Sequence, residues 1–116
     1  MRPVLHGDVM AAARVLLRVP DGKRQAVMQQ MLERASIADL YYKRLGRGHP
    51  EWGNGSLMAV AFGRDMAPEP FLDDPDYCSC FVVVFEALIR WRSERASFSR
   101  PRKTRRLPRL DQAPAA

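Results

Sequence analysis

The chain has 116 residues, of which 47% are hydrophobic and 28% are charged, and its net charge is +6. This length accommodates one small domain, and two cysteines are too few for a disulfide framework, so a reducing, cytoplasmic setting is expected. Neither a signal peptide nor a membrane span is expected, because the first residues contain no apolar run and Glu86 interrupts the most apolar segment.

Two helices are predicted within the first 45 residues. The first is expected over residues 8–18, where Asp8 can act as the N-cap and apolar residues recur at helical spacing until Pro20. The second is expected over residues 22–45, where an apolar stripe continues to a glycine, Gly46, that favours a left-handed C-terminal residue. This second helix should be the longest in the domain.

A turn-rich connection over residues 47–55 is predicted next, because it contains three glycines and a proline. Trp52 is its single large apolar residue and is expected to bury its ring as a plug while the indole N–H finds an acceptor. Ser56 can then cap a short third helix over residues 57–62.

The most apolar segment, residues 76–92, is predicted to form a buried helix around which the domain is organised. Residues 81–85 are also rich in strand-forming residue types, but the apolar pattern is too long for a typical strand. The expected buried face consists of Tyr77, Phe81, Val84, Phe85, Leu88 and Trp91. Cys78, Val82 and Ile89 widen this face, which predicts burial on most sides of the helix.

The residues before this helix contain three prolines and are expected to run extended over residues 66–75, with Phe71 and Leu72 in the core. Three carboxylates stand at the start of the helix: Asp73, Asp74 and Asp76. They are interpreted as helix-capping residues, because neither the glycine nor the glutamate of a calcium-binding loop follows them.

Positive charge is concentrated at the C-terminal end of the chain. Residues 1–96 contain 13 basic and 12 acidic residues, whereas residues 97–116 contain six basic residues and one acidic residue. The basic residues are Arg100, Arg102, Lys103, Arg105, Arg106 and Arg109. We therefore expect an all-α, irregular four-helix domain over residues 1–96, with one helix short, followed by a disordered arginine- and proline-rich tail over residues 97–116.

Three segments together resemble an uncharacterised family of short bacterial proteins. They are LHGD at residues 5–8, HPEWGNGSLM at residues 49–58 and PEPFLDDPDYC at residues 68–78. The resemblance covers roughly residues 1–92 and excludes the tail. The resemblance implies that the three segments belong to one domain. It implies no activity, ligand or catalytic residue for this chain.

The thiols of Cys78 and Cys80, together with His6 and His49, have the ligand types of a zinc site. However, a single residue separates the cysteines, whereas structural zinc sites usually use a longer spacing. On a helix the two side chains would also point roughly 200° apart. We therefore predict two small buried thiols and neither a metal nor another cofactor.

The connection between the second and third helices contains the candidate interaction loop, defined by His49, Glu51, Trp52 and Asn54. A histidine, a carboxylate and the Ser56 hydroxyl also supply the residue types of acid–base or nucleophilic catalysis. No G-x-S-x-G elbow or phosphate-binding loop is present, so no catalytic residue is assigned. The preferred interpretation of the loop is structural, as a capped connection that Trp52 plugs. If the domain has a functional surface, this loop is the first place to expect it, because binding residues concentrate on loops held by a rigid scaffold.

The leading functional hypothesis is a non-enzymatic protein-interaction or regulatory module with an unidentified protein partner and no membrane association. One alternative is an accessory nucleic-acid binder that contacts phosphates through the basic tail without sequence preference. A second alternative is a small enzyme that uses the loop around His49, Glu51 and Ser56. An exposed apolar patch near Trp52 would favour protein binding.

Overall fold

The computed structural model describes the backbone of residues 1–103 and the side chains of residues 1–96. Its elements are α1 (His6–Leu17), the 3-10 turn η1 (Asp21–Lys23), α2 (Arg24–Leu45), α3 (Leu57–Phe62) and α4 (Pro75–Lys103). The predicted all-α domain of four helices, one of them short, is confirmed. Within the described residues, no helix is both long and apolar enough to cross a lipid bilayer.

The helix α4 is longer than expected. It has 29 residues and α2 has 22, so the prediction that the second helix is the longest is wrong. Because no glycine or proline occurs between Pro75 and Pro101, the helical backbone passes the boundary placed after Ala96 and continues to Lys103. The rest of the predicted tail, residues 104–116, lies outside the described residues.

The ends of α1 and α2 follow from their local sequence. α1 begins two residues earlier than predicted, with Leu5 as N-cap, and the carboxylate of Asp8 accepts the Leu5 backbone N–H at 2.7 Å from inside the first turn. At the end of α2, Gly46 adopts the predicted left-handed conformation with a φ of 72° and donates its N–H to the carbonyl of Tyr42.

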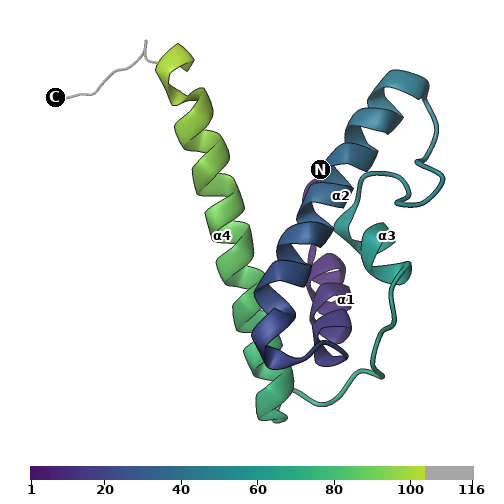
Figure 1. The fold of residues 1–116 in the computed structure, drawn as a ribbon, viewed down its shortest axis with the longest axis vertical. Helices are drawn as coiled ribbons and strands as arrows, with labels where there is room; N and C mark the ends of the chain where they lie inside the picture. The colour runs from purple at the N-terminus through teal and green to yellow at the C-terminus, as the bar shows by residue number, and fades with distance from the viewer. Residues whose placement is uncertain (104–116) are drawn as a thin grey trace, which may run out of the picture.

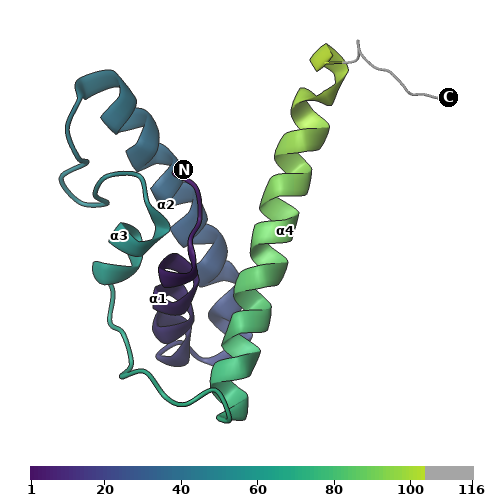
Figure 2. The same ribbon diagram turned by 180° about the vertical axis from the view of Figure 1, so that it is seen from behind.

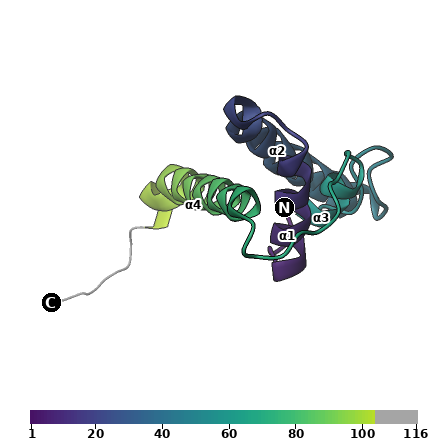
Figure 3. The same ribbon diagram turned by 90° about the horizontal axis from the view of Figure 1, so that it is seen from below.

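The other three helices pack around α1. α2 and α4 converge at one end and diverge toward the other, and α1 lies beside both near the converging end (Figures 1 and 2). α3 packs on α1 and α2, on the side of the domain away from α4 (Figure 3). Three successive alanines of α1, residues 11–13, are buried and allow this close approach. The most central helix is therefore α1 rather than the apolar helix α4.

Only one face of α4 is buried, which corrects the prediction of burial on most sides. Helical steps of three and four place Tyr77, Cys80, Val84, Ala87 and Trp91 in the core. Only α1 and α2 make extensive contacts with α4 in the described structure, so its opposite face has no neighbour to pack against.

Several apolar residues expected in the core are on the surface instead. Val82, Phe85 and Ile89 of α4 are 53%, 51% and 66% exposed. Phe71 and Leu72 in the preceding segment are 86% and 68% exposed, because that segment passes outside α1 on its way to the start of α4 rather than between the helices (Figure 1). These exposed residues extend the apolar surface at the start of α4.

The short helix α3 begins as predicted. The Ser56 hydroxyl accepts the backbone N–H of Ala59 at 3.1 Å, which satisfies one of the free N–H groups at the helix start.

Replacement of this cap, Ser56→Ala, is expected to lower the free energy of unfolding by about 1 kcal/mol, because a helix of six residues has few other bonds to stabilise its first turn. Urea unfolding followed by circular dichroism measures the change. Ser56→Asp retains an acceptor at the same position and should remain close to the original stability. Equal losses in the two variants would contradict the capping role.

Candidate functional site

The loop between α2 and α3 folds into a tight turn that lies against α2. His49 and Gly53 exchange two backbone hydrogen bonds, at 2.7 and 3.1 Å. Gly55 has a φ of 99°, and a Cβ atom added there would lie 2.7 Å from the Cα of Asp39 on α2. Because the closest atom belongs to the helix backbone and the φ angle is positive, only glycine fits this contact without a shift of the loop.

Trp52 anchors the loop through its ring. The His49 ring stacks on it with centroids 4.7 Å apart, and the rings of Tyr41 and His49 form an edge-to-face pair with centroids 4.9 Å apart. The guanidinium of Arg34 lies over the Trp52 ring, 5.2 Å from its centroid, and forms a cation–π contact. The indole is half-buried, and the stack joins the loop to the C-terminal half of α2.

Two polar side chains of the candidate interaction loop, those of His49 and Asn54, bond to the backbone of the loop itself. His49 Nδ1 accepts the backbone N–H groups of Glu51 and Trp52 at 3.1 and 3.2 Å. Asn54 Oδ1 accepts the N–H of Ser56, whose hydroxyl caps α3, and Glu51 is exposed. In the described part of the chain, no hydrogen bond joins His49 to the Ser56 hydroxyl. The nucleophile–base contact needed for hydrolytic chemistry is therefore not formed here.

The two cysteines lie on different faces of α4. Cys78 is exposed, contrary to the prediction, and its thiol donates to the carbonyl oxygen of Leu72 at 2.9 Å. Cys80 is buried, and burial raises the pKa of its thiol. Among the residues with described side chains, no group of three or more His, Cys, Asp or Glu residues is close enough to hold a metal ion.

The acidic residues at the start of α4 have separate roles. Asp74 accepts the backbone N–H groups of Asp76 and Tyr77 at 2.9 and 3.3 Å, which is the predicted capping role. Asp76 instead forms a two-point ion pair with Arg24, with oxygen–nitrogen distances of 2.9 and 3.3 Å. Asp73 is exposed at the surface.

Arg24 joins three elements and was not identified from the sequence. Its side chain is buried, and its Nε donates to the carbonyl oxygens of Leu16 and Val19 at the end of α1, at 2.9 and 3.0 Å. The hydrogen bond from Arg24 lowers the pKa of Asp76, and the same bond raises the pKa of Arg24 although burial opposes this change. This contact connects the start of α2 to the end of α1 and the start of α4.

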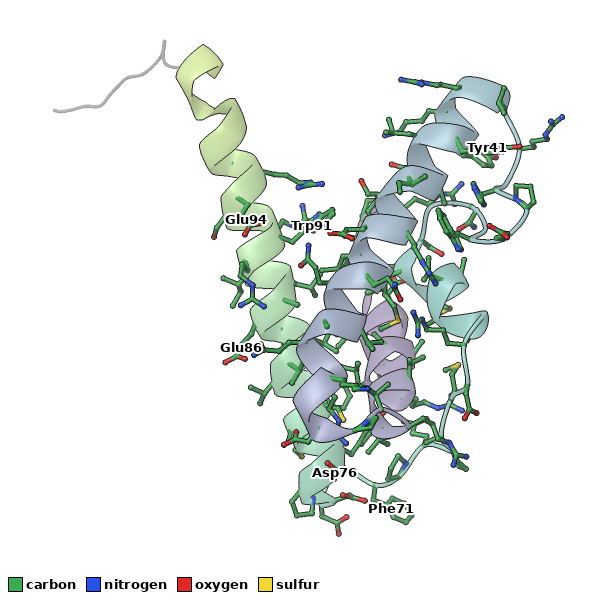
Figure 4. All side chains as sticks on the ribbon, viewed as in Figure 1. Tyr41, Phe71, Asp76, Glu86, Trp91 and Glu94 are labelled. Carbon is green, nitrogen blue, oxygen red and sulfur yellow. The ribbon has the colours of Figure 1, made fainter. Side chains whose placement is uncertain are left out.

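A row of exposed apolar residues lies on the outside of α4. We call Cys78, Val82, Phe85 and Ile89 the outer stripe. Their steps of four, three and four residues place them on one face of the helix, and no described element covers that face (Figures 1 to 3). On the same helix, Trp91 points toward the body of the domain, whereas Glu86 and Glu94 point away from it (Figure 4).

The outer stripe continues into an apolar groove between α1 and α4. The groove has a volume of about 350 Å³ and is lined by His6, Val9, Met10, Glu69, Leu72, Tyr77, Phe81 and Phe85. The hydroxyl of Tyr77 is buried beneath it without a hydrogen-bond partner, and burial raises the pKa of this hydroxyl. Phe85 belongs to both the stripe and the groove, so the exposed apolar surface is continuous.

The structure describes no side chain of the basic residues in the predicted tail. Arg100, Arg102 and Lys103 lie in the helical backbone of α4, without described side chains, and Arg105, Arg106 and Arg109 lie outside the described residues. Nucleic-acid binding through these residues stays a prediction.

Comparison with known proteins identifies a family. The family described as Domain of unknown function (DUF7742) matches residues 2–88, which include α1, α2, α3 and the first half of α4. No curated protein and no solved structure matches the chain. The match includes all three segments that resemble an uncharacterised family. The chain therefore belongs to the DUF7742 family of domains of unknown function.

Proposed function

We propose that this domain is a non-enzymatic protein-interaction module and that the outer stripe of α4 is its docking surface. The main support is the exposure of Val82, Phe85 and Ile89 on a helix whose opposite face forms part of the core. Complete burial of a fully exposed side chain of this size is worth about 1.5–3 kcal/mol, and each of these three, which are between half and two thirds exposed, would gain part of that value. A partner that covers all three would therefore gain a substantial part of its binding free energy from this face.

The spacing of the stripe favours a helical partner. Residues separated by alternating steps of three and four form the seam along which two helices pack. Leu72 lies beside Cys78 at one end of the seam, and the groove next to Phe85 can accept a side chain from the docked helix. The polar groups of the loop around His49 are engaged locally, so that loop is less suited to this role than α4.

A photo-crosslinking amino acid placed on the stripe tests this function in the cells that produce the protein. The Val82 position should yield a discrete crosslinked adduct, because its side chain would lie inside the interface. The same amino acid at Arg90, an exposed position outside the stripe, is the matched control and should yield little adduct. Comparable yields at the two positions would contradict docking through the stripe.

A further inference from the structure

We infer that the molecule docked on the outer stripe is a second copy of this chain, bound through antiparallel pairing of the two α4 helices. This inference rests on the proposed function, because it assigns an occupant to the same surface. Two properties of α4 carry it: the sizes of the side chains along the stripe and the distribution of charge along the helix.

The side-chain sizes fit an antiparallel arrangement. When two stripes run in opposite directions about a twofold axis, Val82 of each copy can face Phe85 of the other. In the same register, Cys78 of each copy faces Ile89 of the other. Every layer then joins a smaller side chain to a larger one, which favours close packing. A parallel pair would instead align the two Phe85 rings.

The charges favour the same direction. The next residue in the 4-3-4 series after Ile89 is Arg92, so parallel helices would bring two Arg92 side chains together. In the antiparallel register, Arg92 reaches the level of Pro75 in the second copy, beside the acidic start of that helix. Asp74 and Asp76 are engaged within their own chain, whereas Asp73 is exposed there. The twofold axis makes this attraction between Arg92 and Asp73 occur twice.

The shape of the domain leaves room for a second helix. The stripe is on the far side of α4 from the core, and none of α1, α2 and α3 packs on that side of the helix. The exposed Leu72, whose carbonyl oxygen accepts the Cys78 thiol, lies at the edge of the stripe and would be partly covered as well. A seam of this length is at the small end of stable interfaces, which bury about 800 Å² per partner, so a dissociation constant of the order of 10 µM is expected.

Sedimentation equilibrium of the purified full chain tests the association directly. The mass should rise from 13.2 kDa toward twice that value as the concentration increases from low micromolar to submillimolar. Ile89→Glu should weaken the dimer at least about tenfold, because two carboxylates would enter an apolar seam. The control Ile37→Glu changes a half-exposed isoleucine on α2 and should leave the mass unchanged. A monomer at every concentration, or a dimer dissociated only by Ile37→Glu, would overturn the inference.

Oxidative crosslinking of Ile89→Cys tests the direction of the helices. Positions 78 and 89 of one helix are about 16 Å apart, which is too far for a disulfide within one chain. An antiparallel dimer should form two disulfides, each between Cys78 of one copy and the new thiol of the other, identified by mass spectrometry of the peptides. Disulfides between two Cys78 residues would show a parallel pair and overturn the arrangement. Arg90→Cys, outside the stripe, should remain unlinked to Cys78.

Charge reversal tests the register and separates this inference from the proposed function. Arg92→Asp and Asp73→Arg should each weaken the dimer several-fold, and the double variant should restore the association. A double variant as weak as the singles would overturn the register. If the chain is monomeric while the Val82 position crosslinks to a different protein, the second copy is excluded and the docking surface stands. If neither dimer nor adduct forms, both proposals fail.

Discussion

Replacement of Arg24 by methionine should lower the free energy of unfolding by about 3 kcal/mol, mainly because the carbonyl groups of Leu16 and Val19 lose their donor. Methionine keeps a flexible chain of similar length, so the change removes the polar head with little loss of packing. The ion pair with Asp76 contributes less, since that carboxylate is more than half exposed and regains water when the guanidinium is removed.

Urea unfolding of three variants separates these contributions. Asp76→Asn breaks the ion pair but leaves both carbonyl contacts of Arg24, so its loss should be clearly smaller than that of Arg24→Met. Arg44→Met changes an exposed arginine on the same helix and should alter stability by less than about 0.5 kcal/mol. A loss in Arg24→Met no larger than that in Arg44→Met would show that Arg24 does not hold the three elements together.

The Asp76 contribution should also depend on pH. The hydrogen bond from Arg24 lowers the pKa of Asp76 below its ordinary value of 3.8. A carboxyl group with a lowered pKa in the folded state contributes stability that is present above the unfolded-state pKa and is lost as the pH falls through the folded-state pKa. The stability difference between the original protein and Asp76→Asn should therefore be constant from about pH 5 to 8 and shrink below about pH 4.

Periodicity predicted the helices well because it depends only on neighbours along the chain. It could not say which face of α4 is buried, since this helix contains two apolar series of helical spacing. One series includes Tyr77, Val84 and Trp91, and the other includes Val82 and Ile89. The positions of α1 and α2 decide between them, and those positions result from long-range packing. The presence of these two series in the sequence indicates that α4 has a second apolar face.

Polar residues with long-range partners were the other feature that the sequence did not reveal. Asp8 was interpreted only from its local position, as a helix N-cap, and Arg24 was given no role, because charged residues are usually exposed. Both are in fact buried and bond to backbone groups of other elements. Ser56 and Gly46 were predicted correctly because capping depends on residues within the same turn.

The three sequence segments that lie within the family match are found at junctions of the fold. LHGD and GNGSLM come together where α1 contacts the start of α3, and PEPFLDDPDYC contains the cap of α4 and the partner of Arg24. At the first junction, a Cβ atom added to Gly7 would lie 2.6 Å from the end of the Met58 side chain. These segments therefore determine how the helices are arranged, and the outer stripe is presented by the scaffold that they hold together.

Replacement of Asp8 is the most direct test of how this scaffold holds α1 and α3 together. Its carboxylate accepts the backbone N–H of Leu5 at 2.7 Å and that of Met58 at 2.8 Å, so one side chain caps α1 and joins it to α3. We expect Asp8→Ala to lower the free energy of unfolding by about 3 kcal/mol, because both N–H groups lose a charged acceptor in a buried site. Asp8→Asn should lose nearly as much, since its NH₂ group faces one of the two donors.

Urea unfolding and amide hydrogen exchange measure the two consequences of this change. The Met58 amide should exchange faster in Asp8→Ala, whereas the amides at the start of α4 should change only with global stability. Asp65→Ala removes an exposed carboxylate from the loop after α3 and should change stability by less than about 0.5 kcal/mol. If Asp8→Ala behaved like Asp65→Ala, the LHGD segment would not hold α1 and α3 together, and the arrangement that presents the outer stripe would require another explanation.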